Sequence, residues 1–204
     1  LQGEGYAKLT GRLLSDFELT KREATTLART YVQTANVQAQ EAVYAANADI
    51  VPRVKWCATL ENIYSSTGRG TCLRCAALDG KEWELSAKRP NAPLHPRCRC
   101  VILPVTATYK ELGLDLPELE AAARPYTKRP DKNIDTGGKR TILEVGQHQG
   151  DYATWFEKQP KSFQLEAVGP KRFELLRSGR VEFADLVDAS GNLRTLDQLS
   201  ALRT

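Results

Sequence analysis

The chain has 204 residues, a hydrophobic content of 41% and a formal net charge of +4. That length allows one domain or two small ones, and the composition supports a real core beneath much polar surface. The charge is too small to predict nucleic-acid binding by itself. No apolar run approaches the roughly 20 residues that a membrane span needs.

The strongest helical pattern covers residues 20–48. Thr20 followed by Glu23 has the spacing of a capping box, and apolar residues then recur every three or four positions. The apolar stripe is narrow and rich in alanine, which favours close packing on another element. A shorter helix, or two turns, is predicted to precede it over residues 6–18.

A strand is predicted over residues 54–60, because four apolar residues alternate there with polar ones: Val54, Trp56, Ala58 and Leu60. This alternation places Cys57 on the opposite face. Further on, Asp79-Gly80 predicts a hairpin turn, with Trp83 on its outgoing strand. Residues 101–105 read as a short buried strand.

The second half of the chain contains a basic stretch between two helical regions. Residues 107–123 are predicted to be helical, and residues 141–204 to form a run of short helices, one of which carries Trp155 and Phe156. Between them, residues 124–140 hold six basic and two acidic side chains and few apolar ones. We interpret this stretch as a basic linker.

Five of the seven cysteines and histidines lie within 29 residues, at Cys72, Cys75, His95, Cys98 and Cys100. Two ligands three residues apart can share one ion, and both C-x2-C and H-x2-C have that spacing. We therefore expect one structural zinc ion held by four of these five side chains. Cys98 and Cys100 remain alternatives for the fourth position. A metal-free packing role or a redox pair is the competing interpretation.

An enzyme is not expected. Four or five soft ligands would close the coordination shell, whereas catalytic zinc needs an open position and a nearby general base. The sequence has no phosphate-binding glycine loop, no G-x-S-x-G and no H-E-x-x-H. The second histidine, His148 in GQHQG, is interpreted as a solvated turn residue.

Together these patterns predict a mainly helical α+β fold. It would comprise a long N-terminal helix, a small zinc-stapled β-hairpin module at residues 70–105 and short C-terminal helices. The expected division is a domain at 1–123, the basic linker at 124–140 and a helical tail at 141–204.

The order of these segments resembles the phage Mu protein F family of minor head proteins of tailed phages. The resemblance rests on KWCATLEN, TCLRCAALDGKEWEL and PLHPRCRCVILPV, followed by DYATWFEKQP and VGPKRFELLRSGRV. It implies a structural virion protein of the portal region or capsid interior, present in the host cytoplasm during assembly. Its implied partners are the portal and major capsid proteins, and its implied roles are head assembly and DNA packaging or exit.

Two other functions stay open at this point. One is a zinc-containing DNA-binding module, with non-specific contacts to DNA through residues 124–140. The other is a metal-dependent nuclease or toxin. Neither a membrane nor a small-molecule substrate is expected.

Overall fold

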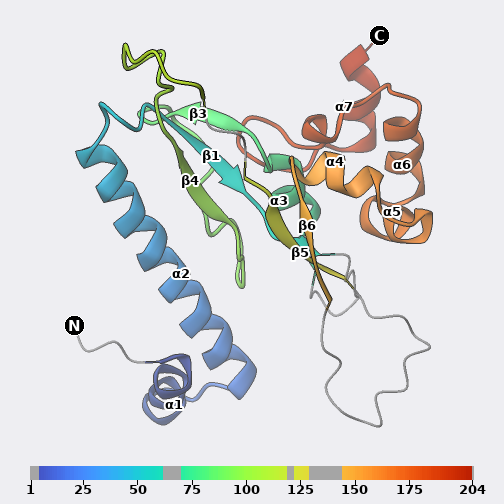
Figure 1. Ribbon diagram of the computed structural model, residues 1–204. Coiled ribbons are helices and arrows are strands. Elements are labelled where there is room, and N and C mark those ends of the chain that lie inside the picture. The colour runs from blue at the N-terminus through green and yellow to red at the C-terminus, as the bar shows by residue number, and fades with distance from the viewer. Residues whose placement is uncertain (1–4, 62–69, 119–121, 129–143, 204) are drawn as a thin grey trace. The chain divides into compact units, whose positions relative to one another are not determined.

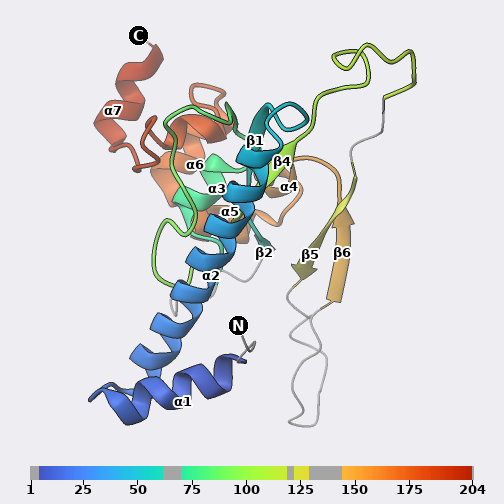
Figure 2. The ribbon, with the colours of Figure 1, turned by 90° about the vertical axis from the view of Figure 1, so that its left-hand side faces the viewer.

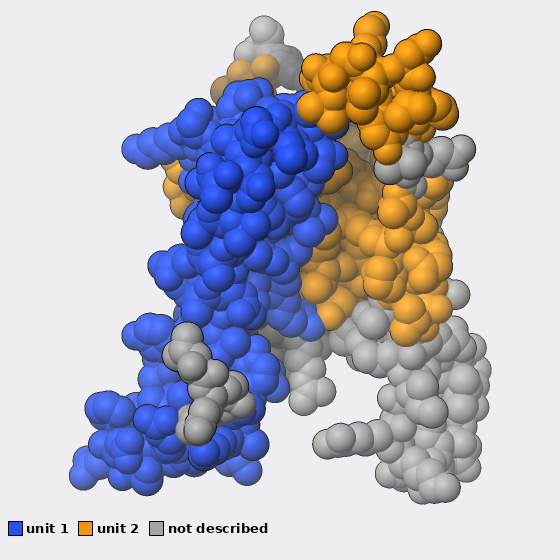
Figure 3. Space-filling model, turned by 60° about the vertical axis from the view of Figure 1, so that its left-hand side comes forward, with its two compact units in different colours: residues 1–54, 83–107 blue, residues 55–82, 108–204 orange. Residues whose placement is uncertain are grey.

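The computed structural model describes residues 5–61, 70–118, 122–128 and 144–203. It confirms the predicted mixed α+β class, with helices accompanied by two small sheets (Figures 1 and 2). Residues 1–54 with 83–107 form one compact unit, and residues 55–82 with 108–204 form a second. Figure 3 colours these as unit 1 and unit 2. Among the described helices, none combines the length and apolarity that a bilayer crossing requires.

Unit 1 is built around two helices, α1 (Tyr6–Asp16) and α2 (Lys21–Ala46). The predicted capping box begins α2: the Glu23 backbone N–H donates to the Thr20 hydroxyl oxygen, and the Glu23 carboxylate accepts from the Thr20 backbone N–H. The residues of α2 that are buried are small: Ala24, Ala28 and Val37. Small side chains allow a close approach, and α2 packs against β4 (Val101–Val105).

The predicted strand at 54–60 forms β1 (Arg53–Cys57) and β2 (Leu60–Glu61). Its alternation is confirmed, since the four predicted inward residues are all buried: Val54, Trp56, Ala58 and Leu60. The first sheet has the order β3-β1-β4, in which β3 is Glu82–Glu84. The Leu85 backbone N–H donates to the Pro52 carbonyl and the Trp56 N–H to the Lys81 carbonyl, which sets β3 antiparallel to β1.

Unit 2 holds a second sheet of order β2-β5-β6. Strand β5 (Arg124–Lys128) runs parallel to β2 and antiparallel to β6 (Glu144–His148). The remaining elements are short helices: α3 (Leu73–Leu78), α4 (Tyr152–Glu157), α5 (Lys161–Val168), α6 (Pro170–Arg177), η1 (Phe183–Leu186), α7 (Leu196–Ser200) and η2 (Ala201–Arg203). Residues 124–128 of the predicted linker form β5, whereas residues 129–140 lie outside the described residues, so a linker there stays a prediction.

An aromatic cluster forms the core of the C-terminal helices. Tyr152 and Trp155 have ring centroids 5.1 Å apart, and the Trp155 and Phe163 rings meet edge to face at 5.7 Å. Phe156 and Phe183 lie 5.0 Å apart. Such ring pairs add to the large apolar area that each side chain removes from water.

Two local predictions are wrong. Asp79-Gly80 joins helix α3 to β3 and does not join two strands: Gly80 has a φ of +79°, and a Cβ there would approach the Asp151 Cβ to 3.0 Å. A turn does form at Asp79-Gly80, but the segment that precedes it is helix α3, which buries its apolar side chains, and not a strand. The predicted helix at 107–123 is also wrong over its described part, where turns end at Gly113 with φ +74°. Three leucines of this segment are exposed to solvent: Leu112, Leu114 and Leu116. A longer helix would therefore gain no stability from burying them.

Candidate metal centre

The first pair of predicted ligands lies at the start of α3. Cys72 is the N-cap residue, and its sulfur accepts a hydrogen bond from the Cys75 backbone N–H at 3.5 Å. The side chains lie one helical turn apart and share one face. Cys75 is only 1% exposed. Immediately before Cys72 in the sequence, the buried Thr71 hydroxyl donates a hydrogen bond to the Thr59 carbonyl. This bond anchors the chain where helix α3 begins.

The second group of predicted ligands lies in the turn before β4. The Cys98 backbone N–H donates to the His95 carbonyl at 3.0 Å, so H-P-R-C forms one compact turn. Cys98 and Cys100 are buried, whereas His95 is half-buried. The Gln33 side-chain amide donates to the Cys100 carbonyl at 2.7 Å and so fastens the end of the turn to α2.

The backbone also selects the tautomer of His95. Its Nδ1 lies 2.8 Å from the Pro96 carbonyl oxygen. A carbonyl only accepts hydrogen bonds, so Nδ1 carries the proton and Nε2 carries the lone pair. Metal-binding histidines commonly have this arrangement, in which the second ring nitrogen donates to a carbonyl or carboxylate.

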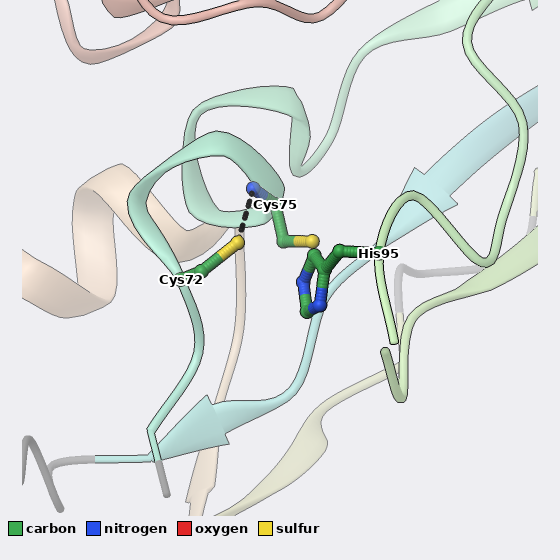
Figure 4. Close-up of side chains that lie close together, drawn as sticks. All are labelled: Cys72, Cys75 and His95. Atoms are coloured by element: carbon green, nitrogen blue, oxygen red, sulfur yellow. Dashed lines mark hydrogen bonds between the residues drawn. The ribbon is translucent and has the colours of Figure 1, made fainter. Parts of the chain in front are cut away.

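The structure brings all five predicted ligands into two overlapping groups. The ligand atoms of Cys72, Cys75 and His95 lie within 4.8 Å of one another, as do those of Cys75, Cys98 and Cys100. Figure 4 shows the first group, with the Cys75 sulfur directed toward the His95 ring. Sulfur ligands of tetrahedral zinc lie about 3.8 Å apart, so a four-ligand site would require members of both groups to move closer together.

The chemistry of this donor set fits a soft or borderline metal. Thiolates and an imidazole suit zinc, whereas magnesium and calcium prefer oxygen ligands. The five side chains therefore could hold a metal ion. All five cysteines of the chain are free of disulfides, so these sulfurs are chemically available as thiolates. Cys57 belongs to neither group of the described residues, as its place in the strand predicted.

A buried ion pair that the sequence did not reveal lies within unit 2. The Asp79 side chain is fully buried and accepts from the backbone N–H groups of Ala58 and Tyr152, both at 2.6 Å. The Arg124 guanidinium binds both carboxylate oxygens and also donates to the Cys57 sulfur at 3.2 Å. Burial lowers the pKa of Arg124, but its bonds to Asp79 outweigh burial and leave the pKa raised. These bonds tie together α3, α4 and the β5 strand.

The interpretation of His148 as a solvated turn residue is wrong. It ends β6, is 5% exposed, and its Nε2 lies 3.1 Å from the Thr154 hydroxyl oxygen. Burial lowers its pKa; the Asp151 carbonyl opposes that effect, and Lys158 and Arg124 reinforce it. The flanking glycines explain the error: Gly150 has a φ of +109°, and a Cβ there would lie 2.6 Å from the Thr154 hydroxyl. Glycine permits this close approach, so here it does not indicate solvent exposure.

The fold and the sulfur-rich centre together define a small α+β protein with a Cys/His cluster that could hold a metal ion. Comparison with family models matches residues 1–103 to the family described as Phage Mu protein F like protein. The chain belongs to this family, which relates it to phage head proteins. Neither the curated proteins nor the solved structures gave a significant match.

Proposed function

We propose that this chain is a structural minor head protein that acts in head assembly beside the portal or at the inner face of the capsid. The observation that carries the proposal is the family match over residues 1–103. The proposal assigns no catalysis to the chain. Its partners are the portal protein, the major capsid protein or both, and its place is the virion.

The test is co-purification from assembled heads. A tagged copy of the chain should be recovered with portal or major capsid protein in particles purified on a density gradient. Particles assembled without it should be fewer, or should contain less DNA. Mature heads that lack the chain by mass spectrometry, together with normal particle yield when it is deleted, would contradict the proposal.

Within this function, one structural zinc ion would fasten residues 70–105. Four ligands would come from Cys72, Cys75, His95, Cys98 and Cys100. Three of the four cysteines among them are buried, and Cys75 belongs to both groups. The zinc would have a structural role, since its shell leaves no position for a substrate.

Elemental analysis tests the zinc directly. Protein purified under reducing conditions should contain about one zinc per chain. Cys75→Ser should lose the metal, because Cys75 is common to both groups. Cys57→Ser is the matched control: it removes a half-buried thiol outside both groups and should keep full zinc content. Equal zinc in both variants would reject these ligands.

Contact with DNA is the second candidate, and the basic charge of residues 124–140 supports it. Arg124 is bound to Asp79, so five basic residues of this stretch remain for phosphates: Lys128, Arg129, Lys132, Lys139 and Arg140. If all five bind, the slope of log affinity against log salt should be about −4.5. Neutralising the five residues should abolish the slope. DNA binding that is insensitive to salt would reject this contact.

A further inference from the structure

One face of α2 carries polar side chains that form hydrogen bonds with the backbone of residues 97–102, from the turn that holds His95 and Cys98 into β4. The Thr30 hydroxyl oxygen accepts from the Arg97 backbone N–H at 3.2 Å. Further along the helix, the Gln33 amide donates to the Cys100 carbonyl and the Tyr44 hydroxyl to the Ile102 carbonyl. The spacing follows the helical repeat, so these residues share a face. All of them belong to unit 1.

Arg97 has an unusual backbone. Of the described residues other than glycine, it alone has a positive φ, +62°. A residue that carries a Cβ is disfavoured in this left-handed backbone conformation, so contacts with its surroundings must hold Arg97 in it. Glycine would adopt the same φ without strain. An arginine at this position indicates that its side chain offsets the backbone cost.

The Arg97 side chain is held by α2. Its Nε donates to the Thr26 hydroxyl oxygen at 2.7 Å, and its Nη2 donates to the Arg22 carbonyl at 3.4 Å. The Thr26 hydroxyl donates its own proton to the Arg22 carbonyl at 2.7 Å, and Thr30 donates likewise to the Thr26 carbonyl. Both hydroxyl oxygens therefore act as acceptors toward Arg97, which carries only donors.

The position of Arg97 in the chain explains why its bonds to α2 matter for the metal ligands. It lies between His95 and Cys98, inside the turn that the Cys98 N–H and the His95 carbonyl close. A change of φ at Arg97 would rotate His95 relative to Cys98 and so change where each ligand atom lies relative to Cys75, which belongs to both groups. We propose that Arg97, held by Thr26 and Thr30, is a positioning residue that sets the second ligand pair for metal binding. This inference rests on the proposed zinc site.

The test measures affinity for Zn²⁺ by chelator competition on the 204-residue chain, below the melting temperature of each variant. Arg97→Ala keeps the strained φ and loses the side-chain bonds, so affinity should fall about 10- to 100-fold, as for other residues that orient metal ligands. Arg97→Gly removes the strain but also the bonds, so it should recover only part of the loss. Full recovery by Arg97→Gly would show that the guanidinium contributes nothing, and would overturn the proposal.

Threonine variants separate positioning from general stability. Thr26→Val removes the acceptor and should weaken Zn²⁺ binding, whereas Thr26→Ser keeps the hydroxyl and should restore it. Thr34→Val is the matched control, because Thr34 bonds to the Thr30 carbonyl in the same way and the structure gives it no bond to Arg97. Its affinity should equal that of the unaltered chain. Co²⁺ absorption should show altered ligand geometry in Arg97→Ala and Thr26→Val, and none in Thr34→Val.

The outcomes distinguish this inference from the zinc proposal. Failure of the unaltered chain to bind Zn²⁺ would end both. Tight binding by the unaltered chain, with affinity in Arg97→Ala within about twofold of it, would end the positioning role alone. That threshold lies well below the 10-fold minimum typical of such residues.

Discussion

Residues 144–203 and residues 70–105 both consist of short elements, yet different chemistry stabilises them. The C-terminal helices enclose an aromatic cluster, with Tyr152 and Trp155 almost fully buried. Residues 70–105 bury cysteines, alanines and a few larger side chains, and polar bonds join part of this segment, including Arg97 and Cys100, to α2. We therefore expect apolar burial to stabilise the first region by itself, whereas the proposed zinc ion would contribute much of the stability of the second.

Removal of the proposed zinc ion should produce the largest difference in stability between the two regions. Structural zinc contributes roughly 10–16 kcal/mol in zinc-finger peptides, so a strong chelator or Cys75→Ser should greatly lower hydrogen-exchange protection across residues 70–105. The helices of residues 144–203 should keep theirs, because their aromatic core contains no ligand. Hydrogen exchange with mass spectrometry measures both at once. Equal loss in both regions would remove the distinction.

The reciprocal change is made in the aromatic core. Trp155→Ala should lower the free energy of unfolding by about 3–5 kcal/mol, the usual cost of removing a buried large aromatic side chain. Denaturant titration followed by circular dichroism measures it. Zinc content should stay near one per chain at temperatures where the variant is folded. Loss of zinc in the folded variant would show that the two regions are coupled.

The Asp79–Arg124 pair tests a polar contribution within unit 2. Asp79→Asn leaves the half-buried Arg124 charge without its ionised partner and should cost up to about 3–5 kcal/mol. The matched control is Glu82→Gln, which breaks an exposed pair with Lys55 at 4.0 Å and should cost less than about 1 kcal/mol. Similar losses in both variants would mean that burial of the Asp79 carboxylate has no special importance.

His148 gives the smallest expected effect, seen as a pH dependence. Its pKa in the folded protein is lowered from the ordinary value of 6.5, so in the interval between the two values the unfolded chain binds more protons. The stability contribution is therefore present above 6.5 and is lost as the pH falls toward the folded value. His148→Gln should flatten the dependence of unfolding free energy between about pH 7.5 and 5.5. An unchanged slope in this variant would reject the assignment to His148.

Sequence patterns predicted the features that depend on local spacing. The capping box at Thr20, the alternation from Val54 to Leu60 and the grouping of the five ligands all follow from period or proximity along the chain. Helices α4 and α7 were likewise expected as members of a short-helix run.

The remaining features depend on partners that are distant in sequence. Asp79 and Arg124 lie 45 residues apart, and no periodic pattern connects them. Arg97 meets Thr26 across 71 residues, and its positive φ leaves no signal because arginine rarely adopts it. His148 was misread because glycine indicates both exposed turns and close packing. These positions are decided by tertiary contacts, which sequence periodicity does not encode.

X-ray absorption at the zinc edge would show whether the predicted ligands hold an ion, because it reports both the metal and its ligands in the purified 204-residue chain. The account predicts four sulfur or nitrogen ligands, with zinc–sulfur distances of about 2.3 Å. Cys57→Ser should leave the spectrum unchanged. A reduced, purified protein without a zinc edge, or with zinc bound mainly by oxygen, would contradict the account.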